Sequence, residues 1–140
     1  MMRWLTHLGG ARATVGAGLA LLAVDRHLGV SALLANAISH AGVQVLKRTV
    51  ARPRPCDPRG RPLALVELPD PFSFPSGHAA ASAAVAVTVV LAHLWLAPLL
   101  LPLAGLVAVS RVKLRVHHTS DVLAGSALGV AGAVAAAALL

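Results

Sequence analysis

Long apolar segments separated by short polar ones form the pattern of this chain. Between Ala79 and Val109 the one ionisable side chain is that of His93, and between Val122 and Leu140 there is none. The latter 19 residues would form a helix of about 28 Å, which is close to the hydrocarbon thickness of a bilayer. We therefore expect this second segment to be a membrane-spanning helix.

The first of these segments is too long for a single crossing. Pro98 and Pro102 predict that it divides into a helix of about 20 residues and a shorter returning segment, because proline interrupts helical hydrogen bonds. Upstream, residues 30–50 predict another helix, which ends at the Arg-Pro-Arg-Pro sequence of residues 52–55. Residues 11–24 are apolar but short for a full span, so they predict a tilted helix, an interfacial helix or one packed within a bundle.

The polar residues 56–74 join two of these segments. They are rich in Pro, Arg and Asp and have no hydrophobic period, which is typical of an extramembrane loop. The predicted fold class is therefore all-α, an integral membrane helical bundle of four to five transmembrane helices. We expect residues 1–140 to form a single membrane-embedded domain, with an N-terminal helix and turn over 1–27 and the helices that carry the polar motifs over 28–140.

Composition agrees with a membrane protein, but the charge needs an explanation. Hydrophobic residues make up 57% of the chain and charged residues 12%, which excludes a disordered chain, and the single cysteine, Cys56, excludes an intrachain disulfide scaffold. The formal net charge is nevertheless +7, and nine of the twelve Lys and Arg residues fall within 47–61 and 111–115. A nucleic-acid-binding protein would spread such residues over a solvated face, so we expect no nucleic-acid partner. Contact with lipid headgroups, or a signal for membrane topology, would by itself account for these clusters.

Four polar side chains lie on one face of the helix predicted over residues 30–50, namely those of Asn36, His40, Gln44 and Lys47. Their spacings of four, four and three residues match the helical repeat. Polar groups are costly against lipid, so we expect this face to point into the bundle. Interhelical hydrogen bonding is the simpler explanation for Asn36 and His40, whereas Lys47, at the end of the helix, is the residue that we connect with chemistry.

Three polar clusters lie at predicted helix ends. Residues 47–55 close one helix, residues 75–78 open the next, and residues 110–121 precede the last. If consecutive helices alternate in direction, all three clusters arrive at the same face of the membrane. A topology signal does not require such convergence, but a binding or catalytic site does.

The residue types in these clusters suit a phosphate-type anion. Lys47, Arg54 and Arg111 supply positive charge, and arginine can bind such an anion through two parallel hydrogen bonds. Ser76 and Gly77 follow a proline at a predicted helix start, where backbone N–H groups and the helix dipole favour an anion. Gly77 would allow a close approach of the backbone, and Ser76 could donate its hydroxyl group or simply cap the helix.

A histidine and a carboxylate stand four residues apart at the start of the last helix. His117 and Asp121 therefore share a helix face, and a carboxylate bonded to one imidazole nitrogen would leave the other as a nucleophile or base. Asp121 is the only acidic residue within the three clusters, which argues against a carboxylate site for Mg²⁺. The His-Glu-x-x-His and paired-cysteine spacings of zinc sites do not occur in the sequence either. We expect neither a metal nor another cofactor.

Eleven positions over 75 residues follow a recognisable order and spacing. They are Lys47 with Arg54-Pro55, then Pro75-Ser76-Gly77-His78, then Ser110-Arg111 with His117 and Asp121. In these motifs the chain resembles the type-2 phosphatidic acid phosphatase superfamily, which comprises metal-independent lipid phosphatases related to vanadium haloperoxidases. At Arg115 and His118, many members have Gly and Tyr, a departure that concerns substrate identity more than catalysis.

The resemblance implies a role for each motif. His117 would attack phosphorus and form a phosphohistidine intermediate, with Asp121 orienting its ring. His78 would protonate the leaving oxygen and then activate water for hydrolysis of that intermediate. The phosphate oxygens would be held by Lys47, Arg54, Ser76, Gly77 and Arg111.

The function that this resemblance implies is a metal-independent membrane phosphatase of a bacterial inner membrane, acting on a lipid phosphate or diphosphate within the bilayer. The candidate substrates are polyprenyl phosphates and diphosphates, phosphatidic acid and phosphatidylglycerol phosphate. A composition rich in Ala, Arg, Gly and Val is typical of a GC-rich bacterial gene and favours a polyprenyl carrier. Membrane lipids are the other expected partners, and a second copy of the chain could complete the bundle as a homo-oligomer.

Two other hypotheses share the same cationic clusters. In the first, the chain is a non-catalytic membrane protein that binds anionic lipids through them. In the second, the site carries vanadate-dependent peroxidase chemistry, which fits less well because such enzymes are mostly soluble and larger. Phosphate release from a lipid phosphate without a divalent metal ion would separate the phosphatase from the lipid-binding protein.

Overall fold

The computed structural model of the chain describes residues 2–68 and 70–140, and these ranges contain six α-helices, one short 3₁₀ helix and two isolated β-bridges. The elements are α1 (Met2–His7), α2 (Ala11–Val24), α3 (Arg26–Val50), α4 (Gly77–Ala92), η1 (Leu94–Leu96), α5 (Ala97–Lys113) and α6 (Thr119–Leu139). Within the described ranges no residue belongs to a β-strand. The all-α fold predicted from the sequence is confirmed.

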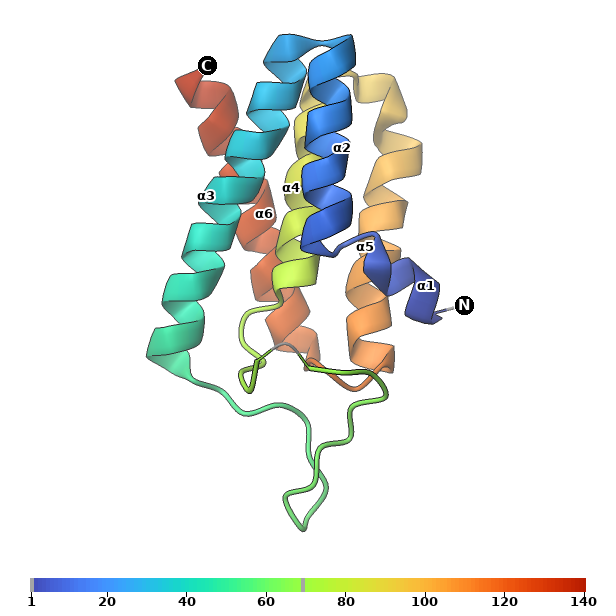
Figure 1. Cartoon of the computed structure of the whole chain (residues 1–140), viewed down its shortest axis with the longest axis vertical. Helices are drawn as coiled ribbons and strands as arrows, with labels where there is room; N and C mark the ends of the chain where they lie inside the picture. The colour runs from blue at the N-terminus through green and yellow to red at the C-terminus, as the bar shows by residue number, and fades with distance from the viewer. Residues whose placement is uncertain (1, 69) are drawn as a thin grey trace.

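The helices α2 to α6 form a bundle that runs along the long axis of the molecule (Figure 1). α4 is central, because it packs against α2, α3, α5 and α6. α6 also packs against α3, α2 packs along α3, and the short α1 lies beside α5. The loop of residues 51–76 protrudes from one end of the bundle, and the chain returns to this end between α5 and α6. We refer to it as the loop end.

Three stretches of the described residues are long and apolar enough to cross a membrane. They are Arg26–Val50 (α3), Leu94–Lys113 (η1 with α5) and Thr119–Leu139 (α6). The helices α2 and α4 are also apolar, but with 14 and 16 residues they rise only about 21 and 24 Å. Large apolar side chains such as Leu99 and Leu123 are exposed on the outside of the bundle, as a surface in contact with lipid requires. The prediction of an integral membrane helical bundle is confirmed.

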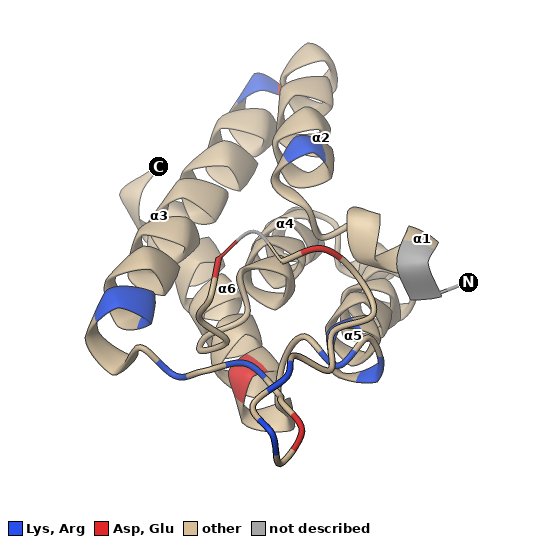
Figure 2. Cartoon of the chain, turned by 60° about the horizontal axis from the view of Figure 1, so that its bottom comes forward, with Lys and Arg blue, Asp and Glu red and all other residues tan. Residues whose placement is uncertain are grey.

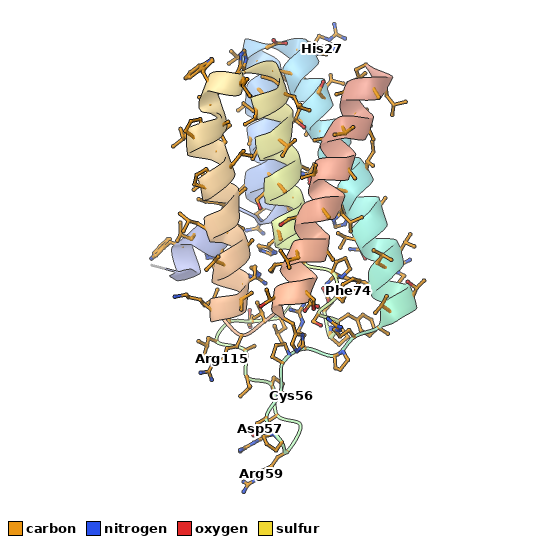
Figure 3. The ribbon with its side chains drawn as sticks, turned by 180° about the vertical axis from the view of Figure 1, so that it is seen from behind. His27, Cys56, Asp57, Arg59, Phe74 and Arg115 are labelled. Carbon is orange, nitrogen blue, oxygen red and sulfur yellow. The ribbon has the colours of Figure 1, made fainter. Side chains whose placement is uncertain are left out.

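Positive charge is concentrated at the loop end. Figure 2 shows Lys and Arg residues along the loop and at the adjoining ends of α3 and α5, with few on the rest of the bundle. The tip of the loop, with Asp57 and Arg59, extends away from the helices, whereas His27 lies at the opposite end of the bundle (Figure 3). The cationic residues noted in the sequence therefore belong to one end of the molecule.

The long apolar segment divides at a different point from the one that its prolines predict. α4 ends at Ala92, the chain turns at His93, and the returning stretch Leu94–Lys113 is the longer of the two segments. The prediction of a shorter returning segment was wrong. Pro98 lies in the first turn of α5, where a missing N–H group costs no hydrogen bond, so it starts a helix instead of ending one, and Pro102 is accommodated inside α5.

The helix α3 starts earlier than predicted and ends where predicted. Asp25 accepts a hydrogen bond from the backbone N–H of Leu28 at 3.0 Å, so this side chain caps the helix before Arg26. At the other end, Ala51 has a left-handed conformation with φ of 47°, and the Arg-Pro-Arg-Pro sequence follows it. Lys47 consequently lies in the last turn of a regular helix.

Small residues bring α6 close to α4. A Cβ atom on Gly125 would overlap the carbonyl oxygen of Ser76, and one on Gly129 would overlap that of Ala80. The backbone N–H of Ser76 donates to the carbonyl oxygen of Asp121 at 2.9 Å. Four fully buried alanines of α3, α4 and α6 form a hydrophobic cluster, namely Ala35, Ala84, Ala133 and Ala136. This packing places the start of α6 beside the start of α4, so the second and third polar clusters meet.

Candidate active site

A cavity of about 520 Å³ at the loop end collects most of the candidate residues. Six of them line it: Lys47, Arg54, Gly77, His78, Arg111 and His117. Ser76 and Asp121 are fully buried and are not among the described residues that line the cavity. Residues from all three polar clusters are thus brought to one place, which is the outcome that alternating helix directions predict.

The polar face of α3 also points into this cavity, because Asn36, His40 and Gln44 line it together with Lys47. The side-chain amide of Asn36 donates to Oγ1 of Thr14 in α2 at 3.2 Å, which is the interhelical hydrogen bond expected from the sequence. His40 differs from that expectation, since its Nε2 lies 3.3 Å from Nε2 of Gln44 on the same helix.

Lys47 is buried in the last turn of α3, and residues of the loop accept hydrogen bonds from its ammonium group. Its Nζ lies 2.6 Å from Oδ2 of Asp70 and donates to the carbonyl oxygen of Phe72 at 3.3 Å. A lysine ammonium has three N–H donors. These two contacts therefore leave a donor with which Lys47 can bind a ligand in the cavity.

Arg54 is fixed between the loop and the segment that leads to His117. Its Nε donates to the carbonyl oxygen of Asp70 at 2.9 Å, and its Nη2 donates to Oδ1 of the same residue at 3.2 Å. Its Nη1 donates to the carbonyl oxygen of Val116 at 2.9 Å. The guanidinium group is held in one orientation, and its remaining N–H groups are available to an anion.

Arg111 has an incompletely satisfied guanidinium group. The residue lies in the last turn of α5 and is only 3% exposed. Its Nη1 donates to Oγ1 of Thr6 in α1, whereas its buried Nε has no hydrogen-bond partner among the described residues. A buried donor without an acceptor is costly, and an anionic oxygen in the cavity would supply that acceptor.

His117 lies in the short segment between α5 and α6 and is buried. Its Nδ1 lies 2.6 Å from the carbonyl oxygen of Ser73; because a carbonyl oxygen only accepts, Nδ1 carries the hydrogen and Nε2 has the free lone pair. Burial, together with the charges of Arg111 and Arg54, lowers the pKa of His117 to about 3. The ring is therefore neutral at ordinary pH, with an Nε2 that can act as a nucleophile.

The carboxylate of Asp121 does not make the hydrogen bond to His117 that the spacing predicts. Its Oδ2 lies 3.8 Å from Nδ1 of His117, beyond hydrogen-bonding distance, and the Ser73 carbonyl oxygen orients the ring instead. Oδ2 accepts from the backbone N–H of His118 at 2.8 Å and lies 3.2 Å from its Nδ1, which closes the first turn of α6. Oδ1 is paired with Arg52 at 2.9 Å.

Ser76 and Gly77 begin α4. The Oγ of Ser76 accepts a hydrogen bond from the backbone N–H of Ala79 at 3.4 Å, so the simple helix cap considered from the sequence is present. Gly77 lines the cavity, and a Cβ atom there would meet only the side chain of Val43, at an ordinary distance of 3.7 Å. The packing of the described residues therefore does not require a glycine at this position, and its place at the cavity would allow the backbone to approach a ligand.

His78 lies in the first turn of α4, and the turn between α1 and α2 covers it. A Cβ atom on Gly9 would crowd the carbonyl oxygen of His78, and one on Gly10 would lie 3.7 Å from its Nε2. The N-terminal segment therefore forms part of the wall of the cavity, next to the imidazole that the resemblance assigns to proton transfer.

Three residues that the sequence does not single out contact the site: Thr6, Asp70 and Ser73. Ser73 contributes a backbone carbonyl oxygen, which leaves no signal in the pattern of side chains. Thr6 is separated from Arg111 by 105 positions. Asp70 is one of three acidic residues between the first two clusters, with Asp57 and Glu67, and the sequence does not distinguish it from them.

Comparison with known proteins identifies the family to which the chain belongs. A family model described as the PAP2 superfamily matches residues 26–140. The decaprenylphosphoryl-5-phosphoribose phosphatase of Mycobacterium tuberculosis is 39% identical over 93 residues, which are 66% of this chain and 50% of that protein. The protein of the same name from Mycolicibacterium smegmatis is 39% identical over 89 residues, 63% and 47% of the two chains. The chain spans about half the length of the curated relatives it matches.

Two solved structures share the fold. The crystal structure of a transmembrane PAP2-type phosphatidylglycerolphosphate phosphatase from Bacillus subtilis is 28% identical, with a TM-score of 0.79 over 99% of this chain and 74% of that one. The crystal structure of Aquifex aeolicus LpxE is 23% identical, with a TM-score of 0.81 over 98% of this chain and 83% of that one, and it bears on the fold alone. The prediction of a bacterial integral membrane protein is confirmed by these similarities and by the three apolar helices.

Proposed function

Because the chain belongs to the PAP2 superfamily, we propose that it is a metal-independent membrane phosphatase that releases phosphate from a lipid through a phosphohistidine intermediate. The observation that carries the proposal is the environment of His117. Its neutral imidazole is hydrogen-bonded through Nδ1 and lines a cavity with Lys47, Arg54 and Arg111. A nucleophile beside three cations is the arrangement that attack on a phosphate group requires.

In the first step, Nε2 of His117 attacks phosphorus, and the bond between phosphorus and the lipid oxygen breaks as the N–P bond forms. His78 transfers a proton to the departing oxygen, so the lipid leaves as a neutral alcohol, or as a lipid monophosphate where the substrate is a diphosphate. The Nδ1–H bond to the Ser73 carbonyl oxygen stabilises the positive charge that develops on the imidazole ring.

In the second step, water attacks the phosphohistidine and the N–P bond breaks. His78, now neutral, accepts a proton from this water, and the bonding electrons return to Nε2 of His117. Inorganic phosphate is released, His117 is again neutral and His78 is again protonated. No reactant other than water is consumed.

The charge of the transferring group is stabilised by side chains and backbone. Lys47, Arg54 and Arg111 bind the phosphate oxygens, and the Nε of Arg111, which has no partner in the described part of the chain, gains an acceptor from the phosphate. We assign a further contact to the backbone of Gly77 at the start of α4, whereas Ser76, which the resemblance also implies as a phosphate ligand, does not line the cavity and caps this helix. No metal or cofactor enters this scheme, since these cations supply the stabilisation that a metal ion would supply.

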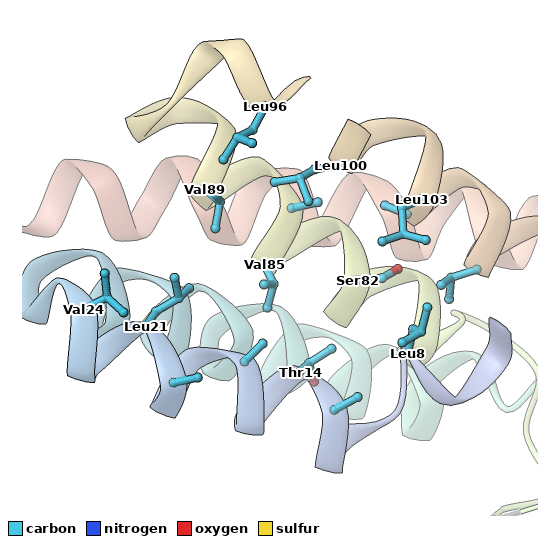
Figure 4. A pocket seen from close by; sticks show the side chains of 16 residues that line it. Leu8, Thr14, Leu21, Val24, Ser82, Val85, Val89, Leu96, Leu100 and Leu103 are labelled. Atoms are coloured by element: carbon cyan, nitrogen blue, oxygen red, sulfur yellow. The ribbon is translucent and has the colours of Figure 1, made fainter. Parts of the chain in front are cut away.

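A second cavity supports a lipid substrate. It has a volume of about 520 Å³, lies between α2, α4 and α5, and is lined by apolar side chains such as Leu21, Val85 and Leu103 (Figure 4). Thr14 lines both cavities, so a hydrocarbon chain in the apolar one is adjacent to a phosphate group in the other. The mycobacterial relatives are named for a decaprenyl-linked phosphate, which favours a polyprenyl chain among the candidate lipids.

Phosphate release by the purified protein in detergent with a metal chelator tests this function. Polyprenyl phosphate, phosphatidic acid and phosphatidylglycerol phosphate are the substrates to compare. We expect turnover of at least one of them and a loss of about 10³-fold or more in His117→Ala. His93→Ala, at the opposite end of α4, is the matched control, because it removes an exposed histidine far from the cavity.

A labelled intermediate tests the mechanism separately. Rapid denaturation of the wild-type protein during turnover of a radiolabelled lipid phosphate should yield an acid-labile phosphoprotein, which His117→Ala should not yield. Binding of all three lipids without phosphate release from any of them would contradict the proposed function and favour the non-catalytic lipid-binding protein.

A further inference from the structure

We propose that Asp70 determines the substrate class of this site by disfavouring a lipid diphosphate relative to a lipid monophosphate. The inference rests on the proposed function, because it takes Lys47, Arg54 and Arg111 as the groups that bind phosphate. The structure places the Asp70 carboxylate against two of these three cations.

The position of this carboxylate is well defined. Oδ2 lies 2.6 Å from Nζ of Lys47, and Oδ1 lies 3.2 Å from Nη2 of Arg54. Oδ1 also accepts the backbone N–H of Phe72 at 3.0 Å, and the backbone carbonyl oxygen of Asp70 accepts from Nε of Arg54 at 2.9 Å. With both oxygens and its own backbone engaged, Asp70 is held at the wall of the cavity that it lines.

Asp70 carries a full negative charge at neutral pH. Partial burial by itself would raise the pKa of its carboxyl group, but the hydrogen bond and charge of Lys47, with the charge of Arg54, outweigh burial and lower that pKa. A substrate phosphate bound to the same cations therefore experiences an adjacent negative charge.

The charges that line the cavity can be counted. Among the described residues that line it, the cations are Lys47, Arg54 and Arg111 and the one carboxylate is Asp70, which leaves a surplus of two positive charges. A phosphate monoester carries a charge of about −2 above its second pKa of about 6. The protonated His78 from which the proposed reaction starts raises this surplus to three, so Asp70 cancels one of four positive charges in the cavity.

A diphosphate brings about one further negative charge into the same cavity. Arg52 is paired with the buried carboxylate of Asp121 and does not line the cavity, so it supplies no further positive charge there. Protonated His78 attracts both substrates, so the comparison rests on the repulsion between Asp70 and the ligand, which is larger for the more highly charged diphosphate. Asp70 thus weakens the binding of both substrates and weakens that of the diphosphate more.

The loop contains a matched control for this charge. Asp57, at the tip of the loop, is paired with Arg61 at 2.9 Å and extends away from the bundle (Figure 3). Asp57→Asn and Asp70→Asn remove the same charge from the same loop, but only the second removes it from the cavity. A selectivity change that both variants share would reflect the overall charge of the loop and not the position of Asp70.

The experiment compares kcat/KM for a lipid monophosphate and a lipid diphosphate that have the same hydrocarbon chain. We expect the wild-type protein to prefer the monophosphate and Asp70→Asn to shift the ratio toward the diphosphate by about tenfold, since Asp70 is partly exposed and its charge partly screened. Asp57→Asn should leave the ratio unchanged. Asp70→Glu, which keeps the charge, should retain the wild-type preference.

Two results would overturn the inference: a wild-type protein that prefers the diphosphate, and an Asp70→Asn protein with the wild-type ratio. If Asp70→Asn does not fold, Asp70→Ser removes the same charge and should shift the ratio of kcat/KM values in the same direction. If the wild-type protein releases phosphate from no lipid, the proposed function fails independently. Calorimetric Kd values for inorganic phosphate and pyrophosphate, measured with wild-type and Asp70→Asn protein, then test the same shift of about tenfold without turnover.

Discussion

The Nδ1 atom of His117 and the carbonyl oxygen of Ser73 lie 2.6 Å apart, although 44 positions separate the two residues in the sequence. Because the carbonyl oxygen can only accept, this contact determines which nitrogen of the proposed nucleophile is free. The loop that supplies it is itself fixed: Ser73 donates its hydroxyl to the carbonyl oxygen of Pro53 at 2.9 Å and its backbone N–H to that of Arg52 at 2.8 Å. The first polar cluster thus positions the third through Ser73, in the loop that joins the first cluster to the second.

The lowered pKa of His117 predicts how the stability of the unliganded protein depends on pH. Its pKa in the folded protein is about 3, against an ordinary value of 6.5, so between these values the unfolded chain binds the proton more readily. The resulting stabilisation is complete above pH 6.5 and is lost as the pH falls through this window. Thermal unfolding in detergent should show a steeper loss of Tm in the wild-type protein than in His117→Asn. Parallel curves would contradict a buried neutral ring.

Asp121→Asn should lower the free energy of unfolding while causing only a small fall in kcat/KM. The carboxylate closes the first turn of α6 and pairs with Arg52, so we expect a loss of about 1–3 kcal/mol in the free energy of unfolding. The ring of His117 keeps its hydrogen bond to Ser73 in this variant, so kcat/KM should fall far less than in His117→Ala. Thermal unfolding and phosphate release measured on the same preparations provide the check. A catalytic loss equal to that of His117→Ala would show that the carboxylate acts on the ring directly.

Thr6→Val tests whether the N-terminal helix takes part in the site. Thr6 lies outside the residues matched by the family model, yet its buried hydroxyl oxygen accepts from Nη1 of Arg111. Valine keeps the shape and removes the acceptor, and a hydrogen bond to a charged group contributes about 1.5–3 kcal/mol, so kcat/KM should fall about tenfold or more. Thr6→Ser retains the hydroxyl and should remain near wild-type activity. Equal activity of the valine and serine variants would mean that α1 does not position Arg111.

Gly125→Ala should destabilise the bundle and disturb the second polar cluster. The added Cβ atom would overlap the carbonyl oxygen of Ser76, so α6 must move away from α4, at a cost of about 1–3 kcal/mol. Gly105→Ala is the control, because within 4 Å of its Cβ position there is no obstructing atom. That change should be neutral or stabilise the helix by about 0.5–1 kcal/mol. Equal Tm values for the two variants would contradict the close packing of α4 and α6.

Much of the fold followed from the sequence, for physical reasons that particular residues illustrate. An apolar run as long as residues 122–140 has few alternatives to a membrane helix, and α6 covers it with the exception of Leu140. The face from Asn36 to Lys47 was predictable because the helical repeat places these side chains together, and all of them line the cavity. The break near His93 was not predictable from Pro98, because a proline is compatible with both the end of one helix and the start of the next.

The sequence by itself determined which end of the bundle carries the three polar clusters, since their spacing and the alternation of helices bring them together. Only the tertiary structure decided which hydrogen-bond and ion-pair partners hold the side chains of the site in place. The acceptor for His117 is a backbone carbonyl oxygen of Ser73, Asp70 reaches two cations from an irregular loop, and Thr6 contacts Arg111 from the other end of the chain. Such contacts have no period and depend on the path of the loop and of α1, so they exist only once the helices have packed.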